Sequence, residues 1–381
     1  MRKILLLAGE ESGLVYAERL RRELASAFAE RGETVEFRGY QSEGFATSDL
    51  AVMGFLAVLA RLRYFLGVQR TMRRVIDEWR PDAVVSIDYP GLNLKLAEYA
   101  KLRGIPAVHL VCPQVWAWHR GRIPRIAAQL TRLLCFFPFE PALFDGTGLQ
   151  AVFIGHPMVD FFAEERRGAA SAEAEASDGV RTLALLPGSR TGEITRILPR
   201  LLATLDVLAE KRASRTPLRV VIPAANEKAR ALIESMLDGR GRFPVEIRDG
   251  GAREILRRAD CAAVASGTAT LEAALARCPT VLVYAVSPFF AWFVRHFVKG
   301  TKYIGLANII ATRAGLPPPM PELLQEGFTP AATAARLAAL LDDDETRRSA
   351  VEALDRTMLE LKSDGAAMTR AAREILSCVS R

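Results

Sequence analysis

Short, uninterrupted runs of apolar residues alternate with longer amphipathic segments along most of this chain. Parallel strands buried on both faces of a sheet have such apolar runs, while the helices that connect them are apolar on one side only. The pattern therefore predicts an α/β fold in which helices cover parallel sheets. We expect strands at residues 3–8, 34–38, 83–87, 107–111, 133–136, 152–154, 182–186, 218–222, 245–247, 261–265 and 280–284.

The alternation is interrupted once, by the small and polar segment EERRGAASAEAEASDGVR at residues 164–181. A segment without periodicity and of this composition is typical of a linker. We therefore predict two doubly wound domains, at residues 1–163 and 182–345, with a cleft between the carboxyl ends of their strands where ligands of such folds bind. Residues 346–381 are strongly helical and either cap the second domain or cross back onto the first.

Basic residues exceed acidic ones, 51 to 44, and the net charge is +7. The excess is uneven, because six basic residues and no acid lie between Glu98 and Glu140. Such zones suit a phosphate-bearing substrate or an anionic membrane surface, and a solvated basic face is the plainer alternative. The sequence has no helix-turn-helix pattern or aromatic and basic stacking platform, so we expect no nucleic-acid partner.

The five cysteines lie far apart without CxxC spacing, and the four histidines form no HxxxH motif. These patterns predict reduced, buried thiols in a cytosolic protein and no dedicated metal site. The apolar stretches are shorter than the ~20 residues of a membrane span. Residues 53–67 and 289–303 mix aromatic and aliphatic residues with Arg and Lys, a composition that favours either a lipid-facing rim or core helices with a basic outer face.

The motif LLPGSRTGEI at residues 185–194 has a strand end, a Pro-Gly turn and the opening of a helix. Arg190 can pair with a diphosphate in fork geometry, and the exposed backbone amides add donors. Helix capping by Ser189 and Glu193 is the alternative, but it leaves Arg190 unexplained.

A second opening of this kind is ASGTATLEAAL at residues 265–275. The glycine turn and helix start suit a phosphate, whereas Glu272, one turn into the helix, suits a ribose diol. Two such openings in one domain fit a sugar nucleotide, with helix capping again as the alternative.

Four segments of the first domain carry candidate residues. AGEESG at residues 8–13 is either an anion-binding turn or a plain strand-to-helix turn. In SIDYPGLN, Asp88 ends a strand ahead of a Pro-Gly turn and is either a general base or an N-cap. CPQVWAWHRGRIPRI, at residues 112–126, suits a sugar or a lipid phosphate headgroup, unless its tryptophans are buried in the core. His156 in GHPMVD either contacts substrate or is structural.

In their order along the chain these segments resemble the lipid-A-disaccharide synthases, glycosyltransferases of family 19. The matching blocks are AGEESG, VMGFLAVL, IDYPGLN, PQVWAWHRGRIPRI, FPFE, GHPMVD, LLPGSRTGEI, SGTATLE, LANII and MPELLQ. The resemblance implies the GT-B architecture, two Rossmann-like domains facing across a cleft.

The same resemblance implies a reaction. A 2,3-diacylglucosamine would be transferred from UDP to 2,3-diacylglucosamine 1-phosphate, with inversion, to form a β-1,6 disaccharide in lipid A biosynthesis. No cofactor or metal is expected, because basic groups and helix N-termini neutralise the leaving diphosphate. The family also implies a cytoplasmic protein held peripherally on the inner face of the bacterial membrane, and a homodimer.

Site residues follow from the matched motifs. For catalysis we expect Asp88 and Glu10. The nucleotide side is expected to comprise Ser189, Arg190, Glu193, Ser266, Gly267, Thr268, Thr270, Glu272 and Asn308. The acceptor side is expected to comprise Ser12, Gly13, Asn93, Trp116, Arg122 and His156.

The chain departs from the family pattern at three positions. Leu14 follows Ser12-Gly13 where the family usually reads SGD, Ala57 replaces a usual Glu, and Gly91 stands where many members carry Asp. Two other hypotheses therefore stay open: a paralogue that binds UDP-sugar or lipid without turnover, and another GT-B UDP-sugar transferase or epimerase.

Overall fold

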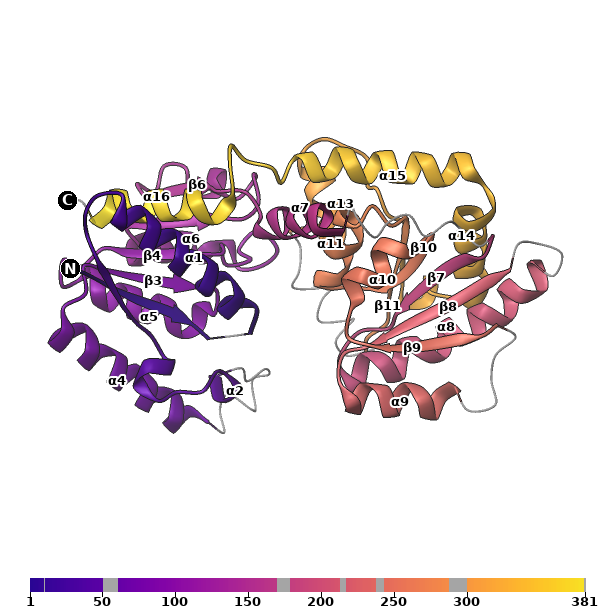
Figure 1. Ribbon diagram of the computed structural model, residues 1–381, viewed down its shortest axis with the longest axis horizontal. Coiled ribbons are helices and arrows are strands. Elements are labelled where there is room, and N and C mark those ends of the chain that lie inside the picture. Colours follow the sequence, from indigo (N-terminus) through magenta and orange to yellow (C-terminus); the bar gives the residue numbers. More distant parts are fainter. Residues whose placement is uncertain are drawn as a thin grey trace. The chain divides into compact units, whose positions relative to one another are not determined.

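The chain folds into two compact units, seen in a computed structural model that describes residues 1–9, 11–50, 61–169, 179–212, 217–237, 243–287 and 300–379 (Figure 1). The first unit is Met1–Asp160 together with Leu361–Arg381, and the second is Phe161–Glu360.

The first unit is built on a six-stranded parallel sheet with the order β2-β1-β3-β4-β5-β6. Its strands are β1 (Arg2–Ala8), β2 (Val35–Arg38), β3 (Ala83–Ile87), β4 (Ala107–Leu110), β5 (Arg132–Cys135) and β6 (Gln150–Phe153). Its helices are α1 (Glu11–Ala29), α2 (Thr47–Leu50), α4 (Leu62–Trp79), α5 (Pro90–Lys101), α6 (Ile123–Gln129) and α16 (Ala367–Val379).

Both faces of this sheet are covered, which is why its central strands β3 and β4 are buried at every residue. In β1, Ile4 and Leu6 pack on one side with residues of α1 and α16. Leu5 and Leu7 point to the other side, where they join residues of α4 and α5. Alternate residues of a strand face opposite sides of a sheet, so two covered faces require an unbroken apolar run.

The second unit repeats this plan with the strand order β12-β11-β10-β7-β8-β9, all pairs parallel. Its strands are β7 (Arg181–Leu186), β8 (Leu218–Ala224), β9 (Val245–Asp249), β10 (Cys261–Ala265), β11 (Thr280–Tyr284) and β12 (Glu322–Leu324). Its helices are α8 (Thr191–Lys211), α9 (Glu227–Leu237), α10 (Ala252–Arg258), α11 (Thr268–Leu275), α13 (Leu306–Arg313), α14 (Pro330–Asp342) and α15 (Asp344–Leu359).

The predicted α/β fold class is confirmed, and each predicted strand is present within two residues at either end. The sequence prediction missed β12, because three half-buried residues are too few to form a recognisable apolar run. Among the described residues, every helix is too short or too polar to cross a lipid bilayer.

In each sheet the strand order reverses at one point. The reversal lies between β1 and β3 in the first unit and between β7 and β10 in the second. At such a switch point the two connections leave toward opposite faces of the sheet, which opens a crevice at the carboxyl edge for a ligand. Four of the predicted motifs follow these four strands.

The segments that join the two units differ from the expected boundaries. Helix α7 (Pro157–Ala169) extends into the predicted linker, and the last residue of that linker, Arg181, is the first residue of β7. Residues 170–178 lie outside the described part of the chain. The predicted C-terminal segment at 346–381 is divided, because α15 belongs to the second unit and α16 packs against α1 in the first (Figure 1).

Hydrogen bonds attach the returning chain to the first unit. The Ser363 hydroxyl donates to the carbonyl oxygen of Ile154 (2.8 Å), and the Ala367 N–H at the start of α16 donates to the Asp160 carboxylate (2.8 Å). A carboxylate at this position satisfies one of the donors left open in a first helical turn.

Replacing Asp160 with alanine is expected to lower the free energy of unfolding by about 1 kcal/mol, because α16 loses its capping acceptor. Urea unfolding measures this change. The Asp160→Asn variant keeps an acceptor oxygen and should recover most of the loss; equal stability of wild type and Asp160→Ala would contradict the capping role.

A buried histidine lies inside the same sheet. His109 of β4 is fully buried, and its Nδ1 is hydrogen-bonded to the Ser86 hydroxyl (2.7 Å). Its Nε2 has no hydrogen-bond partner among the residues that the structure describes. Burial lowers the pKa of His109 from 6.5 to about 3. The ring therefore stays neutral in the folded chain at pH values where the unfolded chain binds a proton.

Acid should accordingly destabilise the fold through His109. Between the unfolded pKa of 6.5 and the folded pKa of about 3, stability falls as the pH falls. From pH 7 to pH 5 this one group should cost about 2 kcal/mol. We expect His109→Gln to show a pH dependence of unfolding weaker by that amount, whereas the exposed control His119→Gln should follow wild type. An unchanged slope in His109→Gln would refute a neutral buried imidazole.

Candidate functional site

The connection from β7 to α8 forms one side of the switch point in the second unit. Gly188 has φ +104°, and a Cβ built there would lie 2.8 Å from the Cβ of Glu193. A side chain at this position would therefore meet both backbone strain and a steric clash. The glycine turn allows the chain to pass close to Glu193 before the helix begins.

Glu193 fastens this turn. Its carboxylate accepts hydrogen bonds from the N–H groups of Ser189 (3.3 Å) and Arg190 (3.4 Å) and from the Arg190 guanidinium (3.1 Å). The N-cap of α8 is Arg190 rather than Ser189, which corrects the expected capping arrangement. Glu193 therefore stabilises the turn by accepting hydrogen bonds from its N–H groups. The Arg190 side chain is 63% exposed at the carboxyl edge of the sheet.

The connection from β10 to α11 forms the other side. Gly267 and Thr268 are exposed, whereas the Thr270 side chain is buried and donates to the carbonyl of Gly267 (2.8 Å). The Ser266 hydroxyl donates to the carbonyl of Ile304 (3.3 Å). Ser266 and Thr270 thus shape the turn, and the exposed first turn of α11 presents N–H groups that suit an anion.

Glu272 has a partner that the local motif did not reveal. Arg253 of α10 donates through Nε to Glu272 Oε1 (3.0 Å) and pairs with Glu165 of α7 (3.5 Å). Glu272 is only partly exposed, and this contact fixes the direction of its carboxylate. Arg253 comes from a different element, so no pattern around Glu272 indicates it.

Asn308 was expected beside the nucleotide. It is fully buried, its amide N–H group donates to Met320 and Glu322 (both 2.8 Å), and its oxygen accepts from Met320 (3.0 Å). The structure thus uses this side chain to join α13 to the segment leading into β12. Its expected place beside the nucleotide stays a prediction.

The switch point of the first unit carries Asp88. Asp88 (φ +48°) and Tyr89 (φ +51°) occupy two successive left-handed positions between β3 and α5. Each costs on the order of 1 kcal/mol in a residue other than glycine, and such strain gathers at functional sites. Tyr89 packs closely on Gly9, where a Cβ would come 2.9 Å from its ring. The glycine thus lets the turns after β1 and β3 meet.

Asn93 stabilises this strained turn through side-chain hydrogen bonds. Its amide donates to the carbonyls of Asp88 (2.7 Å) and Ile87 (3.3 Å), and its oxygen accepts from the Tyr40 hydroxyl (2.6 Å). Asn93 is fully buried and supports the backbone at Asp88, and its expected contact with the acceptor stays a prediction. Burial raises the pKa of the Asp88 carboxyl, and a backbone hydrogen bond from Tyr89 opposes the shift.

The structure describes only some of the remaining residues singled out in the first domain. Glu10 and Ala57 lie outside the described residues. Ser12 and Gly13 belong to the first turn of α1, and Gly13 is buried. Leu14 is half buried and packs against the core that α1 shares with the sheet.

The loop after β4 divides its two tryptophans. Trp116 is 3% exposed and donates its indole N–H to Glu140 (3.1 Å), which corrects our expectation that it faces the acceptor. Trp118 is 43% exposed and lies against the His119 ring, 4.6 Å between centroids. Arg122 follows in the short helix η2 (Arg120–Arg122) and is exposed. The exposed part of this loop therefore contains Trp118 and the arginines that follow it.

His156 is buried between aromatic rings, 5.2 Å from Phe136 and 5.6 Å from Phe137. Burial lowers its pKa to about 3. The N–H of Met158 donates to Nδ1 (3.2 Å), so the neutral ring carries its proton on Nε2. His156 is thus a neutral group that can donate but cannot act as a cation near neutral pH.

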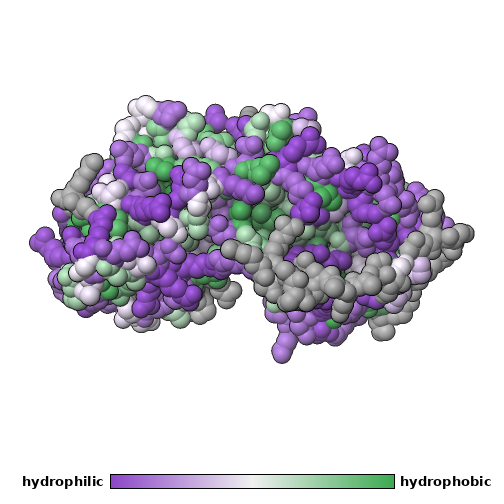
Figure 2. Space-filling model, turned by 45° about the horizontal axis from the view of Figure 1, so that its top comes forward, coloured by the Kyte–Doolittle hydropathy of each residue, from purple (hydrophilic) through white to green (hydrophobic). Residues whose placement is uncertain are grey.

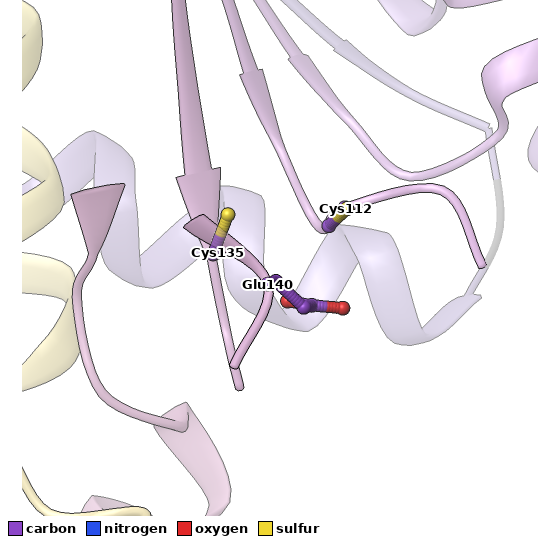
Figure 3. A group of neighbouring side chains, drawn as sticks. All are labelled: Cys112, Cys135 and Glu140. Atoms are coloured by element: carbon purple, nitrogen blue, oxygen red, sulfur yellow. The ribbon is translucent and has the colours of Figure 1, made fainter. Parts of the chain in front are cut away.

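Sequence reasoning missed Glu140, although the FPFE block contains it. This carboxyl is 1% exposed and accepts hydrogen bonds from Trp116 and from the N–H of Phe137 (3.1 Å). Burial raises its pKa from 4.5 to about 8. Cys112 and Cys135 lie beside it (Figure 3). An acid after an apolar run looks like a turn residue, so no sequence signal predicted its burial.

The surface seen in Figure 2 is mainly hydrophilic, with apolar residues in small separate patches. Among the described residues, the large apolar side chains that are exposed include Leu62 and Leu66 at the start of α4 and Trp118. Both regions also carry arginines, so each combines apolar and basic groups.

Two doubly wound units, each with polar turns at its switch point, define the GT-B class of glycosyltransferase architecture. Among solved structures, a UDP complex of MnaA from S. aureus matches with a TM-score of 0.61 at 14% identity, covering 100% of this chain and 98% of that one. MurG from Acinetobacter baumannii matches with a TM-score of 0.58 at 12% identity, covering 99% and 100%. These matches show the fold.

The family follows from sequence. The profile of the lipid-A-disaccharide synthetase family matches residues 4–376. The lipid-A-disaccharide synthase of Azotobacter vinelandii is 36% identical over 390 aligned residues, covering 100% of this chain and 98% of that protein. That of Saccharophagus degradans is 34% identical over 376, covering 96% and 94%. The chain belongs to the lipid-A-disaccharide synthase family and is a glycosyltransferase.

Proposed function

We propose that this chain transfers 2,3-diacylglucosamine from UDP to 2,3-diacylglucosamine 1-phosphate, with inversion, and so forms the β-1,6 disaccharide of lipid A biosynthesis. The observation that carries the proposal is the chemistry at the two switch points. An exposed arginine and two helix N-termini lie at one, and a partly buried carboxyl on a strained turn lies at the other.

On the nucleotide side, Arg190 and the first turns of α8 and α11 bind the UDP diphosphate. Strands β7 and β10 are neighbours in register, with Leu186 opposite Val264, so their following turns leave the same edge side by side. A guanidinium and backbone N–H groups together stabilise the charge that develops on a departing diphosphate. Glu272, oriented by Arg253, accepts hydrogen bonds from the ribose diol.

On the acceptor side, Asp88 acts as the general base. Its carboxylate removes the proton of the acceptor hydroxyl while that oxygen attacks the anomeric carbon of the donor sugar. The bond from that carbon to the diphosphate oxygen breaks, and UDP leaves with the electron pair. The raised pKa supports this role, because a base works best when its pKa approaches the working pH.

The transfer step uses no metal cofactor, because Arg190 and the helix N-termini supply the positive charge that a divalent cation would provide. Turnover should be the same with and without added Mg²⁺ in a UDP-release assay. A strict requirement for Mg²⁺ would overturn this part of the proposal.

We place the protein in the cytoplasm, peripherally on the inner face of the membrane. The exposed Leu62 and Leu66 of α4, and Trp118 next to Arg120 and Arg122, support contact with an anionic lipid surface. The family resemblance also supports a homodimer, which sedimentation in detergent tests.

The deciding experiment measures UDP release by purified protein given UDP-diacylglucosamine, with and without diacylglucosamine 1-phosphate. We expect release only when both acylated sugars are present, and little release with a deacylated acceptor. Release that is indifferent to acylation would favour another UDP-sugar transferase. Binding of the donor without any release would favour a paralogue that has lost turnover, a reading that Leu14 and Ala57 motivate.

A further inference from the structure

Cys112, Cys135 and Glu140 meet at the carboxyl edge of the first sheet. Cys112 follows β4, Cys135 ends β5, and Glu140 lies on the turn after β5 (Figure 3). One ligand atom from each residue, two sulfurs and one carboxylate oxygen, lies within 4.8 Å of the other two. These three side chains are 3%, 0% and 1% exposed.

The charge environment of Glu140 favours a cation as ligand partner. In the part of the chain that the structure describes, no lysine, arginine or histidine forms an ion pair with Glu140. A carboxyl buried without a cation is rare, because its charge loses the solvation of water and gains nothing in return. Two thiols beside it add two further groups that become anionic when they give up their protons.

The carboxylate is also held in a fixed direction. Trp116 donates to Oε1 and the N–H of Phe137 donates to Oε2, both at 3.1 Å. Each carboxylate oxygen can accept a second interaction. Carboxylates that ligate metals are commonly hydrogen-bonded in this way by a surrounding shell that orients them.

We propose that Cys112, Cys135 and Glu140 form a metal site that binds one zinc ion. Two thiolates and a carboxylate are ligands that Zn²⁺ accepts, and three protein ligands leave its fourth position to water. On binding, each thiol gives its proton to solvent, and the two thiolates balance the charge of the ion. Glu140 likewise releases its carboxyl proton to solvent and contributes one carboxylate oxygen.

The site has a structural role and takes no part in the transfer step. The ion ties the end of β4 to the end of β5, and it holds Glu140, which in turn holds Trp116. The loop that carries the exposed Trp118 and Arg122 would thereby be fixed to the sheet. The proposal does not depend on the reaction proposed above.

Cobalt(II) is the direct probe, because thiolate ligands give intense charge-transfer absorption in the near ultraviolet and tetrahedral cobalt absorbs strongly in the visible. Titration of the purified full chain with Co²⁺ under reducing conditions should saturate at about one ion per chain. Added Zn²⁺ should abolish the spectrum, because zinc prefers these ligands. X-ray absorption spectroscopy at the zinc edge of the same wild-type protein, loaded with Zn²⁺, should find two sulfur neighbours, with oxygen atoms completing the coordination shell.

The variants Cys112→Ser and Cys135→Ser should each lose about half of the charge-transfer intensity or all of the binding. Cys278→Ser is the matched control, because Cys278 and Cys261 are also buried thiols near one another but belong to the second unit. It should bind cobalt as wild type does. The Glu140→Gln variant should keep the sulfur bands and weaken the affinity.

Three results would overturn the proposal. These are the absence of a thiolate-to-cobalt band in the wild type, a band of full intensity in Cys135→Ser, and loss of the band in Cys278→Ser. If Cys135→Ser does not fold, the X-ray absorption data on the zinc-loaded wild type decide between the outcomes. A zinc coordination shell without two sulfur atoms excludes the site.

Discussion

The Asp88→Asn variant is expected to release UDP about 10³-fold more slowly than wild type, because loss of a general base typically costs between about 10² and 10⁴ in rate. The loss should appear in kcat, with KM for both sugars nearly unchanged. Asparagine keeps the shape of the side chain and, like aspartate, tolerates the left-handed backbone at this position. The fold should therefore persist while the proton acceptor is lost.

The control for this variant is Asp145→Asn, an exposed aspartate of the same unit, which should retain wild-type activity. The pH profile supplies an independent test. Because burial raises the pKa of Asp88, the acid limb of kcat/KM should lie above the pH at which an exposed aspartate titrates. Activity falls as the pH drops through that pKa, since the base becomes protonated. A profile and rate unchanged in Asp88→Asn would assign the proton transfer to another group.

Replacing Arg190 with alanine should lower kcat/KM by about 10²- to 10³-fold, the usual cost of removing one group that stabilises developing charge. Its guanidinium is mostly exposed and pairs with Glu193 in water, so the variant should lose little stability. The Arg190→Lys variant keeps the charge but not the fork geometry, and it should recover only part of the activity.

Arg348→Ala provides the control for Arg190, because Arg348 is exposed on α15 in the same unit and no nucleotide motif contains it. It should behave as wild type in donor binding and in turnover. Donor binding measured by calorimetry separates ground-state from transition-state effects. If Arg190→Ala binds UDP and turns over as well as wild type does, the diphosphate is held elsewhere.

The sequence predicted the fold closely, because burial on both faces leaves a signal in each strand taken by itself. β3 reads AVVSI and β10 reads CAAVA, and both are buried at every residue. Strand order was not predictable, because pairing depends on contacts between segments far apart in the chain. The path of α16 back to the first unit was likewise left open, since its apolar face alone does not say which sheet it covers.

The sequence predicted where the candidate residues lie in the fold better than it predicted their burial, and their roles stay predictions. Motifs at strand ends indicated Asp88 and Arg190, because a strand-to-helix turn in a parallel sheet lies at the ligand-binding edge. Burial was not predictable from those motifs. Asn93 and Asn308 are surrounded by protein, and Trp116 turns inward while Trp118 turns outward.

The sequence by itself determined the α/β class, the turns at the two switch points and the family, because each depends on local patterns and on their order. Only the tertiary structure decided which side chains meet. β4 and β5 pair in parallel, with Leu110 opposite Leu134, and this register brings Cys112 beside Cys135. Arg253 reaches Glu272 from another helix for the same reason. Such contacts arise from the packing of distant segments, and neither partner carries a local sign of the other.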